Sequence, residues 1–183
     1  MIGWIVFFTL VFLPLLWVLG TYNGLIRIRN HCDESFSNID TELKRRHNII
    51  PNLVQTVKGY AAHEKEVFRA VSEARNRAQQ VPKNPAMQEP LENHLVGSLG
   101  RLMAVVEAYP DLKADQHFLE LQRELVETEN RIQHTRRIYN ANIRDLNNRI
   151  EMFPSSVIAG MLGMGKAPYF ELTDLKMRDV PKV

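Results

Sequence analysis

Residues 32–60 read CDESFSNIDTELKRRHNIIPNLVQTVKGY, and the apolar side chains in this stretch recur in alternating steps of four and three. The same steps continue to residue 78, and twelve of the fourteen positions are apolar. These positions are Cys32, Phe36, Ile39, Leu43, Arg46, Ile50, Leu53, Val57, Tyr60, Glu64, Val67, Val71, Ala74 and Ala78. A repeat of about 3.5 residues is typical of helices that pack lengthwise against one another. The pattern predicts a coiled-coil-like bundle whose apolar seam is interrupted at Arg46 and Glu64.

Pro51 lies inside this seam and leaves two alternatives open. A proline within a helix removes one backbone hydrogen bond and costs about 3 kcal/mol, so residues 44–47 can form a tight reversal. Asn48 would then cap a second helix. The unbroken heptad phase favours a single kinked helix instead. The pattern alone supports both alternatives.

The rest of the chain up to residue 153 predicts two more long helices. Residues 81–90 hold three prolines and no periodic apolar pattern, so we expect a loop there. One apolar stripe then follows from Leu91 to Tyr109, and a second from Phe118 to Phe153, with Asp111 as the expected cap of the last helix. No segment alternates apolar and polar residues as a strand does. The prediction is an all-α, antiparallel four-helix bundle over residues 22–153.

The first 21 residues are expected to be a transmembrane helix. No residue from Ile2 to Leu19 is charged, and this length suffices to cross a hydrocarbon core of about 30 Å. A cleaved secretory signal ending before Thr21 is the alternative, although no Lys or Arg precedes the apolar run. The basic residues that follow the span predict a single-pass inner-membrane protein with its N-terminus outside and its C-terminal domain in the cytoplasm.

Residues 154–183 differ from the helical part, because glycines alternate with Val, Ile, Leu and Met from residue 157 to residue 165. Two interpretations are kept. In the first, the segment forms a short helix that packs back onto the bundle. In the second, it contacts lipid or a membrane partner, as short apolar segments do at membrane interfaces.

Composition and spacing argue against catalysis. The net charge of +2, from 23 basic and 21 acidic residues, indicates no nucleic-acid partner. The six histidines lack the spacings of di-iron or zinc-peptidase helices, and no phosphate-binding glycine loop is present in the sequence. Cys32 lacks an evident base, so we interpret it as a small buried side chain. We therefore predict no cofactor, no metal and no enzymatic activity.

A polar and aromatic pattern, Tyr-Asn-x-x-Ile-Arg-x-x-Asn, occurs at residues 22–30 and again at residues 139–147. On a helix these positions share one face, so each copy offers a ladder of hydrogen-bonding groups. The copies can act as structural glue between the first and last helices. Alternatively, they mark a docking surface at the membrane-proximal end of the bundle.

Three stretches of the chain resemble the LemA family of bacterial membrane proteins. They are residues 22–30, residues 38–60, and residues 109–114 with their continuation through 129–132 to 153–154. The resemblance implies an N-terminal membrane helix, a cytoplasmic four-helix bundle with a turn near Pro51, and no established enzymatic activity. It supplies no catalytic residues.

The leading hypothesis is a membrane-tethered scaffold or adaptor that binds other membrane proteins, or further copies of itself, at the inner surface of the bilayer. The alternatives are a membrane-shaping or lipid-contacting protein and, less favoured, an enzyme with an interhelical site around His63, Glu64, Arg131, Arg136 and Arg137. Arg46 and Glu64, on an otherwise apolar seam, are expected to set register between helices or, in self-association, between chains. The candidate interaction residues are Tyr22, Asn23, Arg27, Asn30, Lys44, Arg45, Arg46, Pro51, Asn52, Tyr139, Asn140, Arg144 and Asn147.

Overall fold

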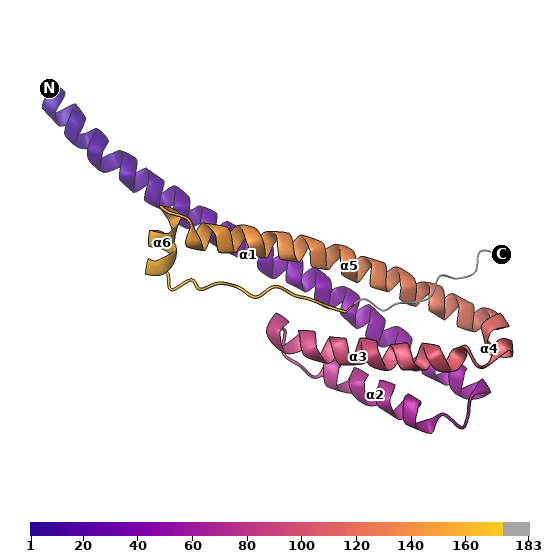
Figure 1. Cartoon of the computed structure of the whole chain (residues 1–183). Coiled ribbons are helices and arrows are strands. Elements are labelled where there is room, and N and C mark those ends of the chain that lie inside the picture. Colours follow the sequence, from indigo (N-terminus) through magenta and orange to yellow (C-terminus); the bar gives the residue numbers. More distant parts are fainter. Residues whose placement is uncertain (174–183) are drawn as a thin grey trace. The chain divides into compact units, whose positions relative to one another are not determined.

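Six helices in the order α1 to α6 make up most of the computed structural model, which describes residues 1–173 (Figure 1). They are α1 (Ile2–Tyr60), α2 (Lys65–Gln79), α3 (Pro85–Val106), α4 (Pro110–Ala114), α5 (Gln116–Glu151) and α6 (Ser155–Met161). No strand occurs among these residues, so the all-α prediction is confirmed. The described chain divides into a first unit, Met1–Ser35 with Ile138–Tyr169, and a second unit, Phe36–Arg137 with residues 170–173.

The beginning of α1 is an apolar helix with its side chains outward. Leu10 is 70% exposed and Leu16 58% exposed. Soluble proteins rarely leave a continuous apolar surface of this kind in contact with water. Within the described part of the chain, α1 alone is long and apolar enough to cross a membrane. It is therefore a candidate membrane span.

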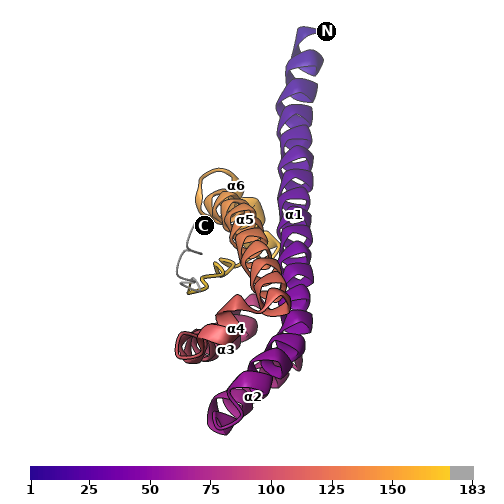
Figure 2. The ribbon, with the colours of Figure 1, turned by 90° about the vertical axis from the view of Figure 1, so that its right-hand side faces the viewer.

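Helix α1 continues through Pro51 without a turn (Figure 2). The alternative of a reversal at residues 44–47, which the family resemblance favoured, is wrong. Pro51 has no N–H to donate to the carbonyl of His47 one turn earlier. Arg75 of α2 supplies the missing donor, because its Nε donates to the His47 carbonyl oxygen at 2.7 Å. A side chain from the neighbouring helix thus satisfies the carbonyl group that proline leaves free.

Replacing Arg75 by methionine is expected to lower the free energy of unfolding by about 1–3 kcal/mol, because the His47 carbonyl loses its partner in a buried position. In a Pro51→Ala background the helix regains its own N–H donor, so the same replacement is expected to cost less. Urea denaturation of the full chain in detergent, followed by circular dichroism, measures this coupling. Arg77→Met, on the exposed face of α2, is the matched control. Equal costs of Arg75→Met in both backgrounds would contradict the explanation.

The chain reverses after Tyr60 and not before Pro51. Residues 61–64 form the turn, and Glu64 immediately precedes α2. Glu64 therefore interrupts the apolar seam because the helix has ended there.

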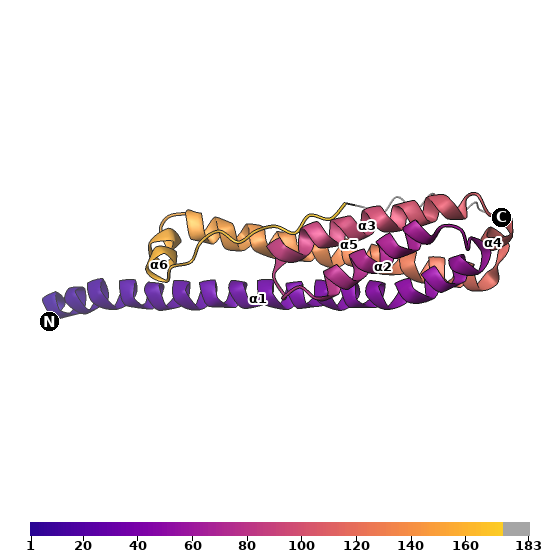
Figure 3. The ribbon, with the colours of Figure 1, turned by 90° about the horizontal axis from the view of Figure 1, so that it is seen from below.

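The core of the second unit is built from α1, α2, α3 and α5, with one side chain from α4. Deeply buried examples, in chain order, are Leu53, Val71, Leu99, Leu112 and Leu125. Arg46 contacts Glu129 and Tyr60 contacts Asp115, so α1 and α5 run in opposite directions in this unit. Helices α2 and α3 lie side by side (Figures 1 and 3).

Two predicted boundaries need correction. The loop expected at 81–90 is shorter, because α3 begins at Pro85 with the Asn84 side chain as its cap. Proline suits the first turn of a helix, where its missing N–H would have no partner anyway. The cap of the long final helix is Asp115 and not Asp111: Asp115 Oδ1 accepts a hydrogen bond from the Phe118 N–H at 2.8 Å.

The C-terminal segment begins with α6, which lies beside α1 in the first unit (Figure 3). Ile158 and Ala159 of α6 are buried against Leu25 of α1, with Val18 packed at the edge of this cluster. The interpretation that this segment packs back on the helices thus describes α6. The part of the predicted segment 154–183 that follows Thr173 lies outside the described residues.

Residues 170–173 form an extended piece of the second unit. Phe170 is fully buried, and its ring packs edge-on against Phe36 with centroids 5.9 Å apart. The side-chain amide of Asn93 donates to the Glu171 carbonyl at 3.2 Å and accepts from the Thr173 N–H at 2.6 Å. Asn93 therefore pairs with this backbone as a neighbouring strand would.

Candidate functional site

The three adjacent basic candidates, Lys44, Arg45 and Arg46, do not form one surface. Lys44 pairs with Asp40 at 2.9 Å, and Arg45 is exposed with its Nε 4.0 Å from Glu42. Arg46 is completely buried. Because successive helix positions point about 100° apart, three adjacent basic residues are spread around α1.

Arg46 lies at the centre of a buried charge cluster in the second unit. Its Nη2 is 2.5 Å from Glu92 Oε2 on α3, and its Nη1 is 2.8 Å from Glu129 Oε1 on α5. His47 Nε2 lies 2.9 Å from the other oxygen of Glu92. Three helices are thereby fixed in register around one guanidinium group. Since Arg46 has no exposed surface, it sets register between helices of the same chain, which is one of the two roles that the sequence predicted for it.

The cluster favours its charged forms despite burial. Burial acts to raise the pKa of Glu92, but the close His47 imidazole and the Arg46 charge outweigh it, so the pKa lies below its usual value. Burial likewise acts to lower the pKa of Arg46, and the charges of Glu129 and Glu92 raise it. These opposing effects leave a charged Arg46–Glu92 pair in the core.

The partners of Arg46 were missed in the sequence analysis. A weak signal exists for Glu92, which lies three residues before Leu95 on the buried stripe of α3. An arginine on one apolar seam and a glutamate on another form the combination that points to a buried pair.

The first copy of the repeated pattern is exposed. Tyr22, Asn23, Arg27 and Asn30 all lie on the surface of α1 just after the apolar segment. They form a polar, aromatic and basic face within a few turns of the candidate membrane span.

The second copy points inward in part. The Tyr139 hydroxyl donates to the Pro168 carbonyl at 3.1 Å, and burial raises the Tyr139 pKa to about 12. The Asn147 amide donates to the Ala167 carbonyl at 3.0 Å and accepts from the Ala167 N–H at 2.9 Å. Through these hydrogen bonds the second copy fixes the extended chain after α6, so its role here is structural.

The remaining candidate residues occupy less decisive positions. Arg144 is exposed on α5 and Asn140 is half-buried. Pro51 is exposed, and Asn52 lines an open pocket of about 370 Å³ with Lys44 and Arg45. None of these positions by itself indicates a chemical activity.

The alternative enzymatic site does not assemble. Tyr60 contacts Asp115, the cap of α5, which places the nearby His63 and Glu64 near the start of that helix. Arg131 lies sixteen residues further along α5, or about 24 Å at 1.5 Å per residue. The predicted grouping of these residues is therefore wrong.

Cys32 lacks the properties of a nucleophile. It is 4% exposed, and burial, with Asp33 and Asp145 nearby, raises its pKa to about 11. A thiolate is the reactive form, so this thiol is inert near neutral pH.

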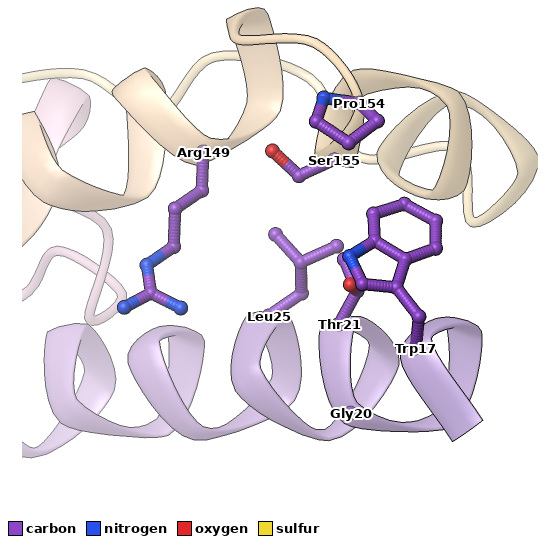
Figure 4. A pocket seen from close by; sticks show the side chains of 7 residues that line it. All are labelled: Trp17, Gly20, Thr21, Leu25, Arg149, Pro154 and Ser155. Atoms are coloured by element: carbon purple, nitrogen blue, oxygen red, sulfur yellow. The ribbon is translucent and has the colours of Figure 1, made fainter. Parts of the chain in front are cut away.

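A pocket with a cavity volume of about 380 Å³ opens in the first unit, beside the end of the apolar segment (Figure 4). Its walls come from α1, the end of α5 and the start of α6. The residues lining it are Trp17, Gly20, Thr21, Leu25, Arg149, Pro154 and Ser155. The Arg149 side chain reaches from α5 toward α1 (Figure 4). None of these positions belongs to a sequence motif that indicates a site.

The sequence pattern that defines the LemA family matches residues 35–183, well over half of the chain. The chain belongs to the LemA family. The resemblance predicted from three stretches of sequence is thus confirmed. The LemA family is not a known enzyme family.

Named relatives include magnetosome proteins. Magnetosome protein MamQ 2 of Paramagnetospirillum magneticum is 28% identical over 179 residues, covering 84% of this chain and 66% of the relative. Protein LemA of Metamycoplasma hominis is 26% identical over 161 residues, covering 88% of this chain and 74% of the relative. Magnetosome protein MamQ of Magnetospirillum gryphiswaldense is 26% identical over 178 residues, covering 84% and 65%. The chain spans just under two thirds of the length of the MamQ relatives.

Proposed function

We propose that this LemA-family chain is a membrane-anchored scaffold or adaptor that acts through protein–protein contacts and not through catalysis. The observation that carries the proposal is the exposed first copy of the repeated pattern, with Tyr22, Asn23, Arg27 and Asn30 on the helix that follows the candidate span. Tyrosine and arginine are enriched at protein interfaces. In the second copy, by contrast, Tyr139 and Asn147 already form hydrogen bonds with the C-terminal segment.

The charge distribution supports a cytoplasmic location for this face. Arg27 and Arg29 follow the apolar run closely. The positive-inside rule places such residues on the cytoplasmic side of the inner membrane, with the N-terminus outside.

Membrane anchoring allows weak protein–protein contacts to be sufficient for binding. A docking face held within a few turns of the bilayer meets other membrane proteins, or further copies of this chain, at a raised effective concentration. Within the second unit, the buried Arg46 cluster ties α1, α3 and α5 together, which suits a rigid scaffold.

A photo-crosslinking amino acid at Asn23, in full-length protein in native membranes, tests the proposal. We expect one reproducible adduct of defined mass, strongly reduced by Arg27→Ala. The matched control places the same crosslinker at Glu73, exposed on α2 in the second unit. Recovery of monomer alone, or the same adducts from both positions, would count against a docking role for residues 22–30.

Lipid contact by the C-terminal segment is the second candidate function. Phe153 is 83% exposed and Met161 78% exposed. Both belong to the region around α6, which packs on α1 between Val18 and Leu25. Exposed apolar side chains at the end of a membrane span suit the bilayer interface.

A further inference from the structure

The pocket lined by Trp17 and Arg149 lies at the depth of the lipid headgroups. Residues 2–19 span about 27 Å at 1.5 Å per residue, close to the thickness of the hydrocarbon core. The headgroup layer adds about 5–8 Å on each side of that core. Trp17 lies about 3 Å before the end of this stretch and Leu25 about 9 Å beyond it. The pocket between these two residues therefore opens where lipid phosphate groups are found.

The pocket contains a cation without a partner. Within residues 1–173, the Arg149 guanidinium makes no hydrogen bond or ion pair to another residue. Figure 4 shows it directed across the pocket toward α1. The nearby Glu151 carboxylate is engaged with Lys166 at 2.5 Å, so it does not neutralise this group. Arginine binds phosphate through paired N–H donors, which suits an anionic occupant.

Gly24 allows Arg149 to adopt this position. A Cβ atom at residue 24 would lie 3.1 Å from Arg149 Nη1, closer than ordinary van der Waals contact. Glycine inside a helix is less favourable than alanine by about 1 kcal/mol. The close approach of the guanidinium to the α1 backbone explains why a glycine stands at residue 24 of the helix.

Two further donors line the same space. Figure 4 shows the indole nitrogen of Trp17 on the side that faces Thr21. Neither the Trp17 indole N–H nor the Thr21 hydroxyl has a hydrogen-bond partner among the described residues. Tryptophan is typical of the membrane interface, where its ring is apolar and its N–H meets polar headgroups. The pocket thus combines one cation, two free donors and an apolar rim.

We propose that this pocket binds the headgroup phosphate of an anionic membrane phospholipid. A lipid, and not a free phosphate ion, is favoured because Phe153, the chain neighbour of the pocket residue Pro154, is exposed and suits contact with an acyl chain. The cytoplasmic leaflet is rich in anionic lipid, which matches the proposed orientation of the chain. The proposal requires the membrane anchor but is independent of the scaffold function.

Native mass spectrometry of the full chain in detergent, titrated with phosphatidylglycerol or phosphatidylcholine, tests this site. We expect the first phosphatidylglycerol to bind about tenfold more tightly than phosphatidylcholine. Arg149→Gln should remove this preference, and Arg149→Lys should keep part of it because the charge remains without the planar fork. Arg137→Gln, the same change at an exposed position three turns earlier on α5, should leave the preference intact.

Each outcome decides for or against the site. The assignment would be overturned if the unsubstituted chain retained both lipids equally. It would also be overturned if Arg149→Gln and Arg137→Gln lost the preference for phosphatidylglycerol to the same extent. Displacement of phosphatidylglycerol by millimolar inorganic phosphate would replace the lipid with a free anion as the occupant. Circular dichroism of each variant shows whether the helices are retained. Failure of crosslinking at Asn23 leaves this measurement unaffected, so the two proposals fail separately.

Discussion

Replacing Arg46 by methionine is expected to lower the free energy of unfolding by about 3–5 kcal/mol. The methionine fills the volume of the arginine stem, but Glu92 and Glu129 then face each other without the cation that lies between them at 2.5 and 2.8 Å. Breaking a buried ion pair by removing one partner typically costs this amount, because an uncompensated charge is left behind. Urea denaturation of the full chain in detergent measures the loss.

Arg45→Met is the matched control, since Arg45 is the exposed neighbour of Arg46 on the same helix. It should change stability by less than about 0.5 kcal/mol. The triple variant with Met at positions 46, 92 and 129 should recover most of the loss, because an apolar replacement of a whole buried cluster is often neutral. A cost for Arg46→Met no larger than that for Arg45→Met would refute this account of the cluster.

Lowering the pH is expected to reduce the difference in unfolding free energy between the unsubstituted chain and the Arg46→Met variant. In the unsubstituted chain the Glu92 pKa lies below its usual 4.5, so its contribution to stability is present above that value and is lost as the pH falls through the folded-state pKa. Without Arg46, burial is expected to raise the Glu92 pKa, so the penalty is largest near neutral pH and shrinks as the carboxylate becomes protonated. The difference in unfolding free energy should therefore fall between about pH 7 and pH 4. A constant difference would exclude Glu92 as its source.

The sequence identified Arg46 but not its partners, and the reason is distance along the chain. The seam from Cys32 to Val57 is periodic, so a charged residue on it is visible locally. Glu92 and Glu129 lie 46 and 83 residues away, and each belongs to a helix whose rotation about its axis is set only by packing. Only the position of Glu92, on the stripe that includes Leu95, carried a local signal.

The ambiguity at Pro51 has a related cause. Backbone rules state what a proline removes, but the replacement donor is Arg75, which lies on the neighbouring helix α2 and 28 residues after His47, the residue whose carbonyl it satisfies. Similarly, Asn93 and Asn147 bind the extended C-terminal chain, but the periodic apolar pattern of the sequence does not mark them. Polar contacts between elements are decided by tertiary geometry, whereas helices and seams follow from local pattern. The pocket lined by Arg149 could not be predicted for the same reason. Gly24 and Arg149 lie on different helices and approach each other only in the folded chain.

Replacing both Leu10 and Leu13 by arginine is expected to move most of the protein out of the membrane fraction. Each arginine near the middle of a span opposes insertion by about 2.5–3.5 kcal/mol, whereas each apolar residue favours it by only about 0.3–0.6 kcal/mol. Two arginines therefore cancel most of what residues 2–19 contribute. Alkaline extraction of membranes, with immunodetection of the chain, measures the distribution, and Gln55→Arg with Gln122→Arg is the control that adds the same charge outside the apolar segment. Retention of the Leu10 and Leu13 variant in membranes would show that other parts of the chain, α6 foremost, hold it there. An intact mass that begins at Thr21 in the unsubstituted protein would instead identify the apolar segment as a cleaved signal.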